Sequence, residues 1–179
     1  MNGALIDLAC LSFGFKIIPI PLNSTSEHAS YIINHSKITH LFIGGENAEK
    51  IWNDIRHSHD TVTIAISEAN QITNYSMNWD SFLSSSDFVQ NFDVNDQLSS
   101  IDMNAIQTIM YTSGTTANPK GIIFDQVNIM SKRFARALAL PSLSSEDIFL
   151  AYLPLFHTFG RYFEMLGSCL LYTSPSPRD

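Results

Sequence analysis

The stretch from Tyr111 to Gly121, YTSGTTANPKG, is the part of the sequence best suited to chemistry. It joins two predicted strands and holds four Ser and Thr hydroxyls, two glycines and one lysine. Gly114 lets the backbone approach a ligand closely, exposed amides and hydroxyls donate hydrogen bonds, and Lys120 adds a mobile positive charge. These properties favour a loop that wraps a polyphosphate.

Other kinds of loop share some of these residues. A Walker loop, as in P-loop kinases and GTPases, needs a lysine followed directly by Ser or Thr and then a helix, whereas Lys120 is followed by Gly121 and a predicted strand. Ser113 lacks the Gly-x-Ser-x-Gly context of a hydrolase nucleophile. A polar turn whose hydroxyls bond to their own backbone is what a generic loop of this composition would favour.

The complete pattern is longer than a generic loop. Tyr-Thr-Ser-Gly-Thr-Thr-x-x-Pro-Lys-Gly resembles the phosphate-binding signature of adenylate-forming (AMP-binding) enzymes, which include acyl-CoA synthetases, luciferases and peptide-synthetase adenylation domains. One position departs, because Ala117 stands where that family usually has glycine, and alanine is strained if the backbone there needs a positive φ. The resemblance implies a catalytic Lys120 and Mg²⁺ beside Thr116. It implies that ATP is bound by Thr112, Ser113, Gly114, Thr115, Thr116, Lys120 and Gly121.

A second segment, Tyr152 to Gly160, resembles the next motif of the same family, Leu-Pro-Leu-x-His followed by an aromatic residue or glycine. A single histidine after an apolar strand is by itself more typical of a structural residue. His157 follows Lys120 by 37 residues (157 − 120), in the family's order. The resemblance therefore implies a catalytic His157 beside the acyl substrate. Leu-Pro-Leu-Phe-His, with Arg161 near Glu164, favours fatty acyl-CoA ligases.

The function implied is that of an ATP-dependent carboxylic acid:CoA ligase with a fatty acid as substrate. The carboxylate attacks the α-phosphate of ATP, pyrophosphate leaves, and the acyl-adenylate forms a thioester with coenzyme A, while Mg²⁺ offsets the charge on pyrophosphate. The partners would be a small carboxylic acid, ATP and CoA. Two alternatives stay open: a non-catalytic nucleotide-binding or interaction module, and another adenylate-forming enzyme such as a peptide-synthetase adenylation domain.

Histidines elsewhere do not favour a metal site. His57 and His59 lack a carboxylate or cysteine partner at ligand spacing, so we expect a solvated loop pair. His28 and His35 are expected on an exposed helix.

The hydrophobic pattern around the motifs alternates between strands and helices, which predicts an α/β fold with a largely parallel sheet flanked by helices. The resemblance makes this a partial N-terminal domain of the adenylate-forming fold. Helices are predicted at 4–15, 24–33, 48–56, from 125 onward, and 159–166. Strands are predicted at 17–22, 39–43, 62–66, 106–111, 122–124 and 148–153. Residues 67–104 are predicted to form an irregular excursion with one short helix near 79–83.

Two of these helices carry a predicted apolar face. In the first helix, the residues that recur at helical spacing and form this face are Leu5, Leu8, Ala9, Ser12 and Phe13. The helix after Asp125 is predicted to bury Val127, Met130, Phe134 and Leu138. Its solvated face is predicted to carry Lys132, Arg133 and Arg136.

Composition narrows the class of protein. Of 179 residues, 45% are hydrophobic and 15% charged, which excludes an intrinsically disordered chain. A net charge of −7 gives no basic surface for nucleic acid. Two cysteines, Cys10 and Cys169, are too few for a disulfide scaffold or a cysteine zinc site. No apolar run reaches the ~20 residues of a membrane span, so we expect a cytoplasmic protein without an integral membrane segment, with peripheral membrane contact left open.

The expected organisation is one partial AMP-binding domain over 1–168. No Tyr-Gly-x-Thr-Glu segment, ribose-binding Thr-Gly-Asp or C-terminal catalytic lysine follows His157. We therefore expect a fragment of a longer enzyme that is inactive alone. Residues 169–179 fit no element of the family and look like translated sequencing-adapter read-through, the rival interpretation being a native disordered terminus.

Overall fold

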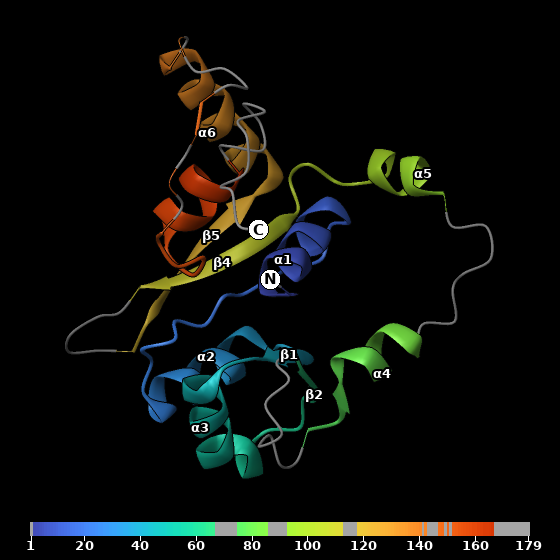
Figure 1. Ribbon diagram of the computed structural model, residues 1–179, viewed down its shortest axis with the longest axis vertical. Coiled ribbons are helices and arrows are strands. Elements are labelled where there is room, and N and C mark those ends of the chain that lie inside the picture. The colour runs from blue at the N-terminus through green and yellow to red at the C-terminus, as the bar shows by residue number, and fades with distance from the viewer. Residues whose placement is uncertain are drawn as a thin grey trace.

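The computed structural model describes residues 2–66, 75–85, 93–112, 118–140, 142, 147–148, 150 and 152–166. Within these ranges the chain forms two lobes, drawn one below the other in Figure 1. The first lobe comprises residues 26–66 and 75–85. The second lobe comprises the described residues from 106 to 166 together with helix α1, Asn2–Ser12, which lies between the two sheets.

The first lobe is a small parallel sheet with helices packed against it. Its strands are β1 (His40–Ile43), β2 (Val62–Ala65) and β3 (Met77–Asn78), hydrogen-bonded in the order β1-β2-β3. Its helices are α2 (Ser26–Ser36), α3 (Glu46–Ile55), the 3₁₀ turn η1 (Arg56–Ser58) and α4 (Trp79–Ser84). Helices and sheet enclose a core of Ala29, Ile33, Ile43, Trp52, Ile55 and Ala65. The alternation of strands and helices confirms the predicted fold class.

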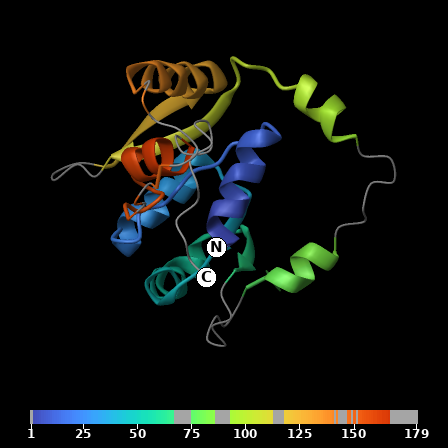
Figure 2. The ribbon, with the colours of Figure 1, turned by 45° about the horizontal axis from the view of Figure 1, so that its top comes forward.

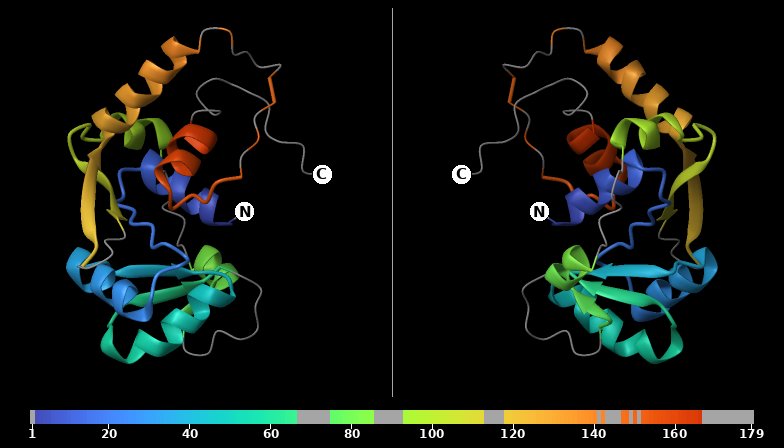
Figure 3. Two further views of the ribbon diagram at one scale, coloured as in Figure 1. Left: turned by 90° about the vertical axis from the view of Figure 1, so that its left-hand side faces the viewer. Right: turned by 90° about the vertical axis from the view of Figure 1, so that its right-hand side faces the viewer.

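The second lobe is built on an antiparallel pair. Its elements are β4 (Ile106–Thr112), β5 (Lys120–Asp125), α6 (Gln126–Ala139) and the π-helix η2 (Phe159–Met165). Figure 3 shows β5 on the outer side of the lobe and η2 on its inner side, near α1. Its buried apolar cluster is small and consists of Leu11, Met110, Ile129 and Tyr162.

The predicted strand at 17–22 is wrong. Ile17 makes one isolated parallel bridge to Thr108, and its N–H donates to Gln107 O at 2.9 Å, but no ladder continues from it. Pro19 and Pro21 lack the N–H groups that a ladder requires. Of the predicted strand at 148–153, residues 149 and 151 lie outside the described ranges, and Tyr152 and Leu153 are not in a strand.

The predicted faces of two helices are also wrong. In α1 the buried residues are Ile6, Asp7 and Leu11, while Leu5 is exposed. A helix that is apolar nearly all round carries little information on which side faces the core. In α6 the buried residues include Ile129 and Arg133, whereas three residues of the predicted face are exposed: Val127, Phe134 and Leu138.

The region 67–104 contains more regular structure than expected. The short helix predicted near residues 79–83 is confirmed as α4 and is capped by Asn78, whose side chain accepts from Ser81 N–H at 2.7 Å. The strand β3 and the helix α5 (Val94–Ser99) were not predicted. Both α4 and α5 project to one side of the molecule (Figure 2).

Candidate functional site

The two ends of the Tyr111–Gly121 segment lie side by side. β4 and β5 pair in antiparallel register, so that Thr112 is opposite Lys120. The Thr112 hydroxyl donates to the Lys120 carbonyl at 3.4 Å. The Lys120 side chain is exposed, and in the part of the chain that the structure describes it has no ion-pair partner. A lysine so placed is free to bind an anion. Four of the predicted ligands lie outside the described residues: Ser113, Gly114, Thr115 and Thr116.

Gly121 has a packing reason to be glycine. It is paired with Tyr111 across the ladder, and a Cβ on Gly121 would lie 2.7 Å from Ile109 Cγ2 and 3.3 Å from the Tyr111 ring. Ile109 is β-branched and sits in a strand, so it has little freedom to move aside. Glycine at 121 therefore allows the Tyr111 ring to lie across β5.

Tyr111 is held by a residue that sequence reasoning missed. His35 Nδ1 lies 2.8 Å from the Tyr111 hydroxyl, and its ring meets the tyrosine ring edge-on at 5.9 Å between centroids. The Tyr31 ring also stacks on the His35 ring, with 5.2 Å between the ring centroids. Burial raises the pKa of Tyr111, against a hydrogen bond from Ser36 that lowers it. His35 was expected only on an exposed helix. It is exposed, but it also ties α2 to the strand that leads into the predicted phosphate loop.

His157 sits in a tight turn immediately before η2. Its backbone N–H donates to Pro154 O at 2.9 Å, and its carbonyl accepts from Arg161 N–H at 3.0 Å. Its Nδ1 accepts from the Phe159 N–H at 3.3 Å, so in this geometry the ring proton is on Nε2. The imidazole is exposed and stacks on Phe159. His157 therefore presents a hydrogen-bond donor to the outside of the turn.

Gly160 fixes how closely η2 approaches this turn. A Cβ there would lie 2.5 Å from Pro154 O and 2.6 Å from Leu153 O, both backbone atoms. Any side chain at 160 would push the π-helix away from the segment that carries His157. π-Helical segments are rare and are frequent at functional sites.

A buried charged network anchors η2 to the rest of the second lobe. Arg161 is fully buried, and its Nε donates to Asp7 Oδ2 at 2.8 Å while Nη2 donates to Asp7 Oδ1. Its Nη1 donates to Thr108 Oγ1 at 2.7 Å, and that hydroxyl donates in turn to Ile17 O at 2.6 Å. Asp7 and Thr108 thereby join α1 and β4 to the helix that follows His157. A bidentate arginine–carboxylate pair fixes orientation as well as distance.

The sequence held one signal for this network, namely an aspartate within an otherwise apolar helix. Asp7 also acts on its neighbour Cys10: burial raises the pKa of the Cys10 thiol, and the Asp7 charge raises it further, against Arg161. A raised pKa leaves less of the Cys10 thiol ionised.

Arg133 is not solvated, contrary to the prediction. It is buried, and its Cζ lies 4.6 Å from the centroid of the Tyr162 ring. Arg161 Cζ lies 5.5 Å from the same centroid, and the Phe124 ring lies 5.5 Å away on another side. Burial raises the pKa of Tyr162, against both guanidinium groups. The Tyr162 ring thus contacts two guanidinium groups, one of them from α6, and an aromatic ring from β5.

The segment that contains Lys120 and the segment that contains His157 are connected through β4. Among the described residues no hydrogen bond or ion pair joins Lys120 to His157. The link runs along β4, from Thr112 beside Lys120 to Thr108 and from there to Arg161 in η2. Within the same ranges, no group of three or more His, Cys, Asp or Glu side chains is placed to hold a metal ion.

The model of the family described as AMP-binding enzyme matches residues 3–173. The chain therefore belongs to the AMP-binding enzyme family, as its motifs predicted. Long chain acyl-CoA synthetase 4 of Arabidopsis thaliana is 28% identical over 170 residues, covering 87% of this chain and 25% of that protein. Fatty acyl-CoA synthetase A of Dictyostelium discoideum is 29% identical over 168 residues, covering 88% and 24%. The chain thus spans about a quarter of the length of these relatives.

Solved structures share the fold. ATP-bound MatB from Rhodopseudomonas palustris superimposes with a TM-score of 0.68 at 15% identity, over 99% of this chain and 33% of that one. A malonyl-CoA ligase in complex with methylmalonyl-CoA and AMP gives 0.65 at 20% identity, over 98% and 32%. These likenesses confirm the predicted fold, which the chain shares with about a third of each of these solved structures. None of the helices in the described ranges is long and apolar enough to cross a membrane.

Proposed function

We propose that this chain is the part of an ATP-dependent carboxylic acid:CoA ligase that binds the phosphates of ATP. The observation that carries the proposal is the family match over residues 3–173, which contains the Tyr111–Gly121 signature on the turn between β4 and β5. The reaction joins a carboxylate to AMP with release of pyrophosphate, and then transfers the acyl group to the thiol of CoA. The names of the curated relatives and the ligands of the structural relatives support both steps.

The proposed ligands of the phosphates are the hydroxyls and amides of the turn together with Lys120. Lys120 fits this role because its side chain is exposed at the start of β5 and has no ion-pair partner in the described part of the chain. Catalysis by such a loop is positioning and charge neutralisation. The residues proposed to contact the phosphates are Thr112, Ser113, Gly114, Thr115, Thr116, Lys120 and Gly121.

Mg²⁺ is proposed beside Thr116, where it would neutralise charge on the departing pyrophosphate. His157 is proposed on the acyl side of the site. Its exposed Nε2–H could donate to the carboxylate of the acid or of the forming adenylate, because Nδ1 is already occupied by the Phe159 N–H. The buried Arg161–Asp7 pair would hold the turn that presents His157.

We propose a fatty acid as the substrate, supported by the long-chain and fatty acyl-CoA synthetases among the relatives. We also propose that residues 1–168 are one partial domain, that 169–179 are not native, and that the chain does not adenylate acids by itself. The exposed apolar side chains of β5 and α6 would pack against residues of the complete enzyme. We propose that this enzyme lies in the cytoplasm.

An acid-dependent ATP–pyrophosphate exchange assay tests the proposal. The protein encoded by the complete gene should exchange with long-chain fatty acids and much less with short acids or amino acids, and the 179-residue chain should not exchange. Exchange with amino acids only would favour a peptide-synthetase adenylation domain. Absence of exchange with every acid, in a protein that still binds ATP, would favour a non-catalytic module.

A further inference from the structure

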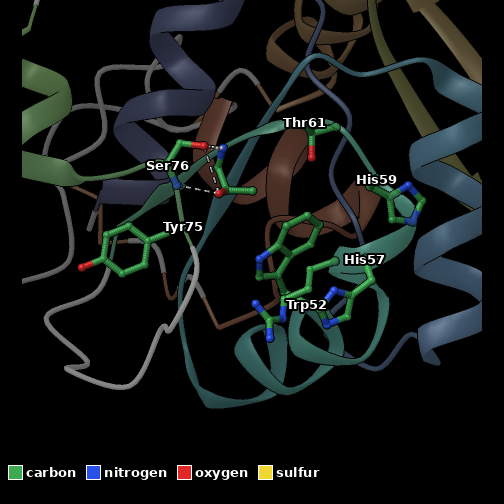
Figure 4. A pocket seen from close by; sticks show the side chains of 8 residues that line it. Trp52, His57, His59, Thr61, Tyr75 and Ser76 are labelled. Carbon is green, nitrogen blue, oxygen red and sulfur yellow. Dashed lines mark hydrogen bonds between the residues drawn. The ribbon is translucent and has the colours of Figure 1, made fainter.

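Two histidines of the first lobe form side-chain hydrogen bonds, and the two bonds differ in what they join. His59 Nε2 lies 2.9 Å from Ser30 Oγ, and its ring stacks on Trp52, so His59 is not the solvated side chain that the sequence suggested. Figure 4 shows His59 and Trp52 among the side chains around the groove at the end of α3. This bond stays within the first lobe. The bond of His35 leaves that lobe and reaches Tyr111 of β4 (Figure 1).

The first-lobe core fixes the place of His35. Ile32 and Ile33 of the same helix are 1% and 3% exposed, and Ile33 belongs to the apolar core beneath the sheet. The Tyr31 ring, one helical turn before His35, stacks on the imidazole with 19° between the ring planes. The imidazole is exposed, yet its helix and its ring plane are both held. His35 is therefore a fixed point on the surface of the first lobe.

Tyr111 contacts both ends of the proposed phosphate-binding segment. Its backbone directly precedes Thr112, and it is paired across the ladder with Gly121, next to Lys120. Its ring lies across β5, because a Cβ on Gly121 would be 3.3 Å from Cζ and 3.4 Å from Cε1 of that ring. Tyr111 is only 8% exposed. A displacement of this side chain would therefore disturb the strand positions that carry Thr112 and Lys120.

The Tyr111 hydroxyl is bonded from two successive residues at the end of α2. His35 Nδ1 lies 2.8 Å away, and Ser36 also forms a hydrogen bond with this hydroxyl. Burial raises the pKa of Tyr111, so the hydroxyl keeps its proton at neutral pH. A phenol hydroxyl both donates and accepts, so the bond to His35 forms with either tautomer of the imidazole. The contact joins the first lobe to β4 through a single polar atom of the second lobe.

We propose that His35 is a positioning residue of the phosphate site, which holds Thr112 and Lys120 in place through its bond to the Tyr111 hydroxyl and thereby strengthens the binding of MgATP. The proposal rests on the function proposed above, since it takes Lys120 as a ligand of the phosphates. His35 itself does not touch the phosphates and acts through Tyr111. Binding groups that are held in place before the ligand arrives lose less freedom on binding, which raises affinity.

Titration of the protein of the complete gene with MgATP tests the proposal. His35→Leu and Tyr111→Phe each remove one half of the bond and should weaken ATP binding by about threefold to tenfold, the scale of one neutral hydrogen bond. The double variant should bind ATP no more weakly than Tyr111→Phe alone, because the two changes break the same contact. The KM for the fatty acid in ATP–pyrophosphate exchange should stay within about twofold in all three variants, since the contact lies at the phosphate side of the site.

Two further variants separate positioning from a loss of stability. His35→Asn keeps a polar side-chain atom near the place of Nδ1 and should recover most of the affinity that His35→Leu loses. His59→Leu is the matched control, because it removes a histidine hydrogen bond that stays within the first lobe. It should lower the urea midpoint followed by tryptophan emission and leave the ATP affinity within about twofold.

Unchanged ATP affinity in His35→Leu and Tyr111→Phe would overturn the proposal, and so would an equal loss in His59→Leu or in His35→Asn. These outcomes differ from a failure of the proposed function. A wild-type protein that binds MgATP but exchanges with no acid would contradict the ligase reaction, and the ATP affinities of the variants would still decide the role of His35. A wild-type protein that binds no ATP would overturn both.

Discussion

The two lobes are stabilised in different ways. The first lobe encloses an apolar core between its sheet and two helices, and its buried residues are mainly aliphatic. The second lobe buries fewer apolar residues and, in their place, a fully buried arginine with its carboxylate partner. It also leaves apolar side chains in the open, with Leu138 81% exposed. Others on its surface are Ile122, Ile123, Phe134, Ile148, Leu150 and Tyr152.

The two lobes therefore differ in what their buried residues supply: mainly stability in the first lobe and mainly a fixed geometry in the second. Apolar burial stabilises in proportion to area, whereas a buried ion pair pays a desolvation cost that its attraction roughly repays. What the Arg161–Asp7 pair supplies is a fixed geometry among α1, β4 and η2. The lobe that carries the proposed site is therefore expected to be the less stable of the two, as is common for functional elements.

The largest effect is expected from breaking the buried pair. Arg161→Met leaves Asp7 buried without a partner and should destabilise the second lobe by about 3–5 kcal/mol. Both tryptophans lie in the first lobe, so tryptophan emission during urea unfolding reports on that lobe, while hydrogen exchange of the β4 amides reports on the second. Exchange in β4 should accelerate with little change in the emission midpoint.

The matched control for that variant is the double replacement Asp7→Leu with Arg161→Met. It removes the orphaned charge and should recover much of the lost protection. Equal destabilisation of both lobes by Arg161→Met would contradict the claim that the buried ion pair acts on the second lobe alone.

A core deletion should act on the other lobe. Ile33 is buried in the first cluster, and Ile33→Ala should lower the free energy of unfolding reported by tryptophan emission by about 3 kcal/mol. The matched control Ile123→Ala removes the same atoms from an exposed strand position and should cost within about 0.5 kcal/mol. Similar losses for both would mean that β5 is covered in solution.

A pH effect is expected in the first lobe. Burial lowers the pKa of His59 below its ordinary value of about 6.5, so the folded state favours the neutral imidazole. Stability from this residue is complete above that value and falls as the pH drops through it, because the unfolded chain takes up the proton first. Urea midpoints followed from pH 8 to pH 5 should fall less steeply in His59→Gln. A steeper fall in the variant would contradict the sign.

The smallest effect on stability is expected on the open face of α6. Phe134→Ser replaces an exposed aromatic side chain and should change the free energy of unfolding by less than about 0.5 kcal/mol. Because it interrupts exposed apolar surface, it should reduce self-association, measured by sedimentation velocity. A destabilisation above 1.5 kcal/mol, roughly a tenfold change in the folding equilibrium, would show that Phe134 is in fact packed.

Sequence patterns predicted the elements that carry local signals. The helix predicted at 24–33 is found as α2, where the Thr25 hydroxyl accepts from the His28 N–H, and the Tyr111–Gly121 signature lies between the two strands predicted to flank it. These patterns did not predict long-range pairing. Arg161 and Asp7 are 154 residues apart, so nothing local to either indicates that they meet.

The exposed apolar residues explain the error on α6. A 3.6-residue pattern predicts that Phe134 and Leu138 face a core, which requires a surface to cover them. In this chain Arg133 and Ile129 face inward instead, because the Tyr162 ring lies on that side. Phe134 and Leu138 therefore have no surface to cover them among the described residues of this chain.

The most direct test of the central claim is the loss of adenylation when Lys120 is removed. In the protein of the complete gene, Lys120→Ala should lower fatty-acid-dependent ATP–pyrophosphate exchange by about a hundredfold or more, the scale of losing one electrostatic group at a reacting phosphate. Lys132→Ala, an equal truncation at an exposed position of α6, should leave the exchange rate within about twofold. Equal rates in the two variants would contradict the assignment of the β4–β5 turn as the phosphate site.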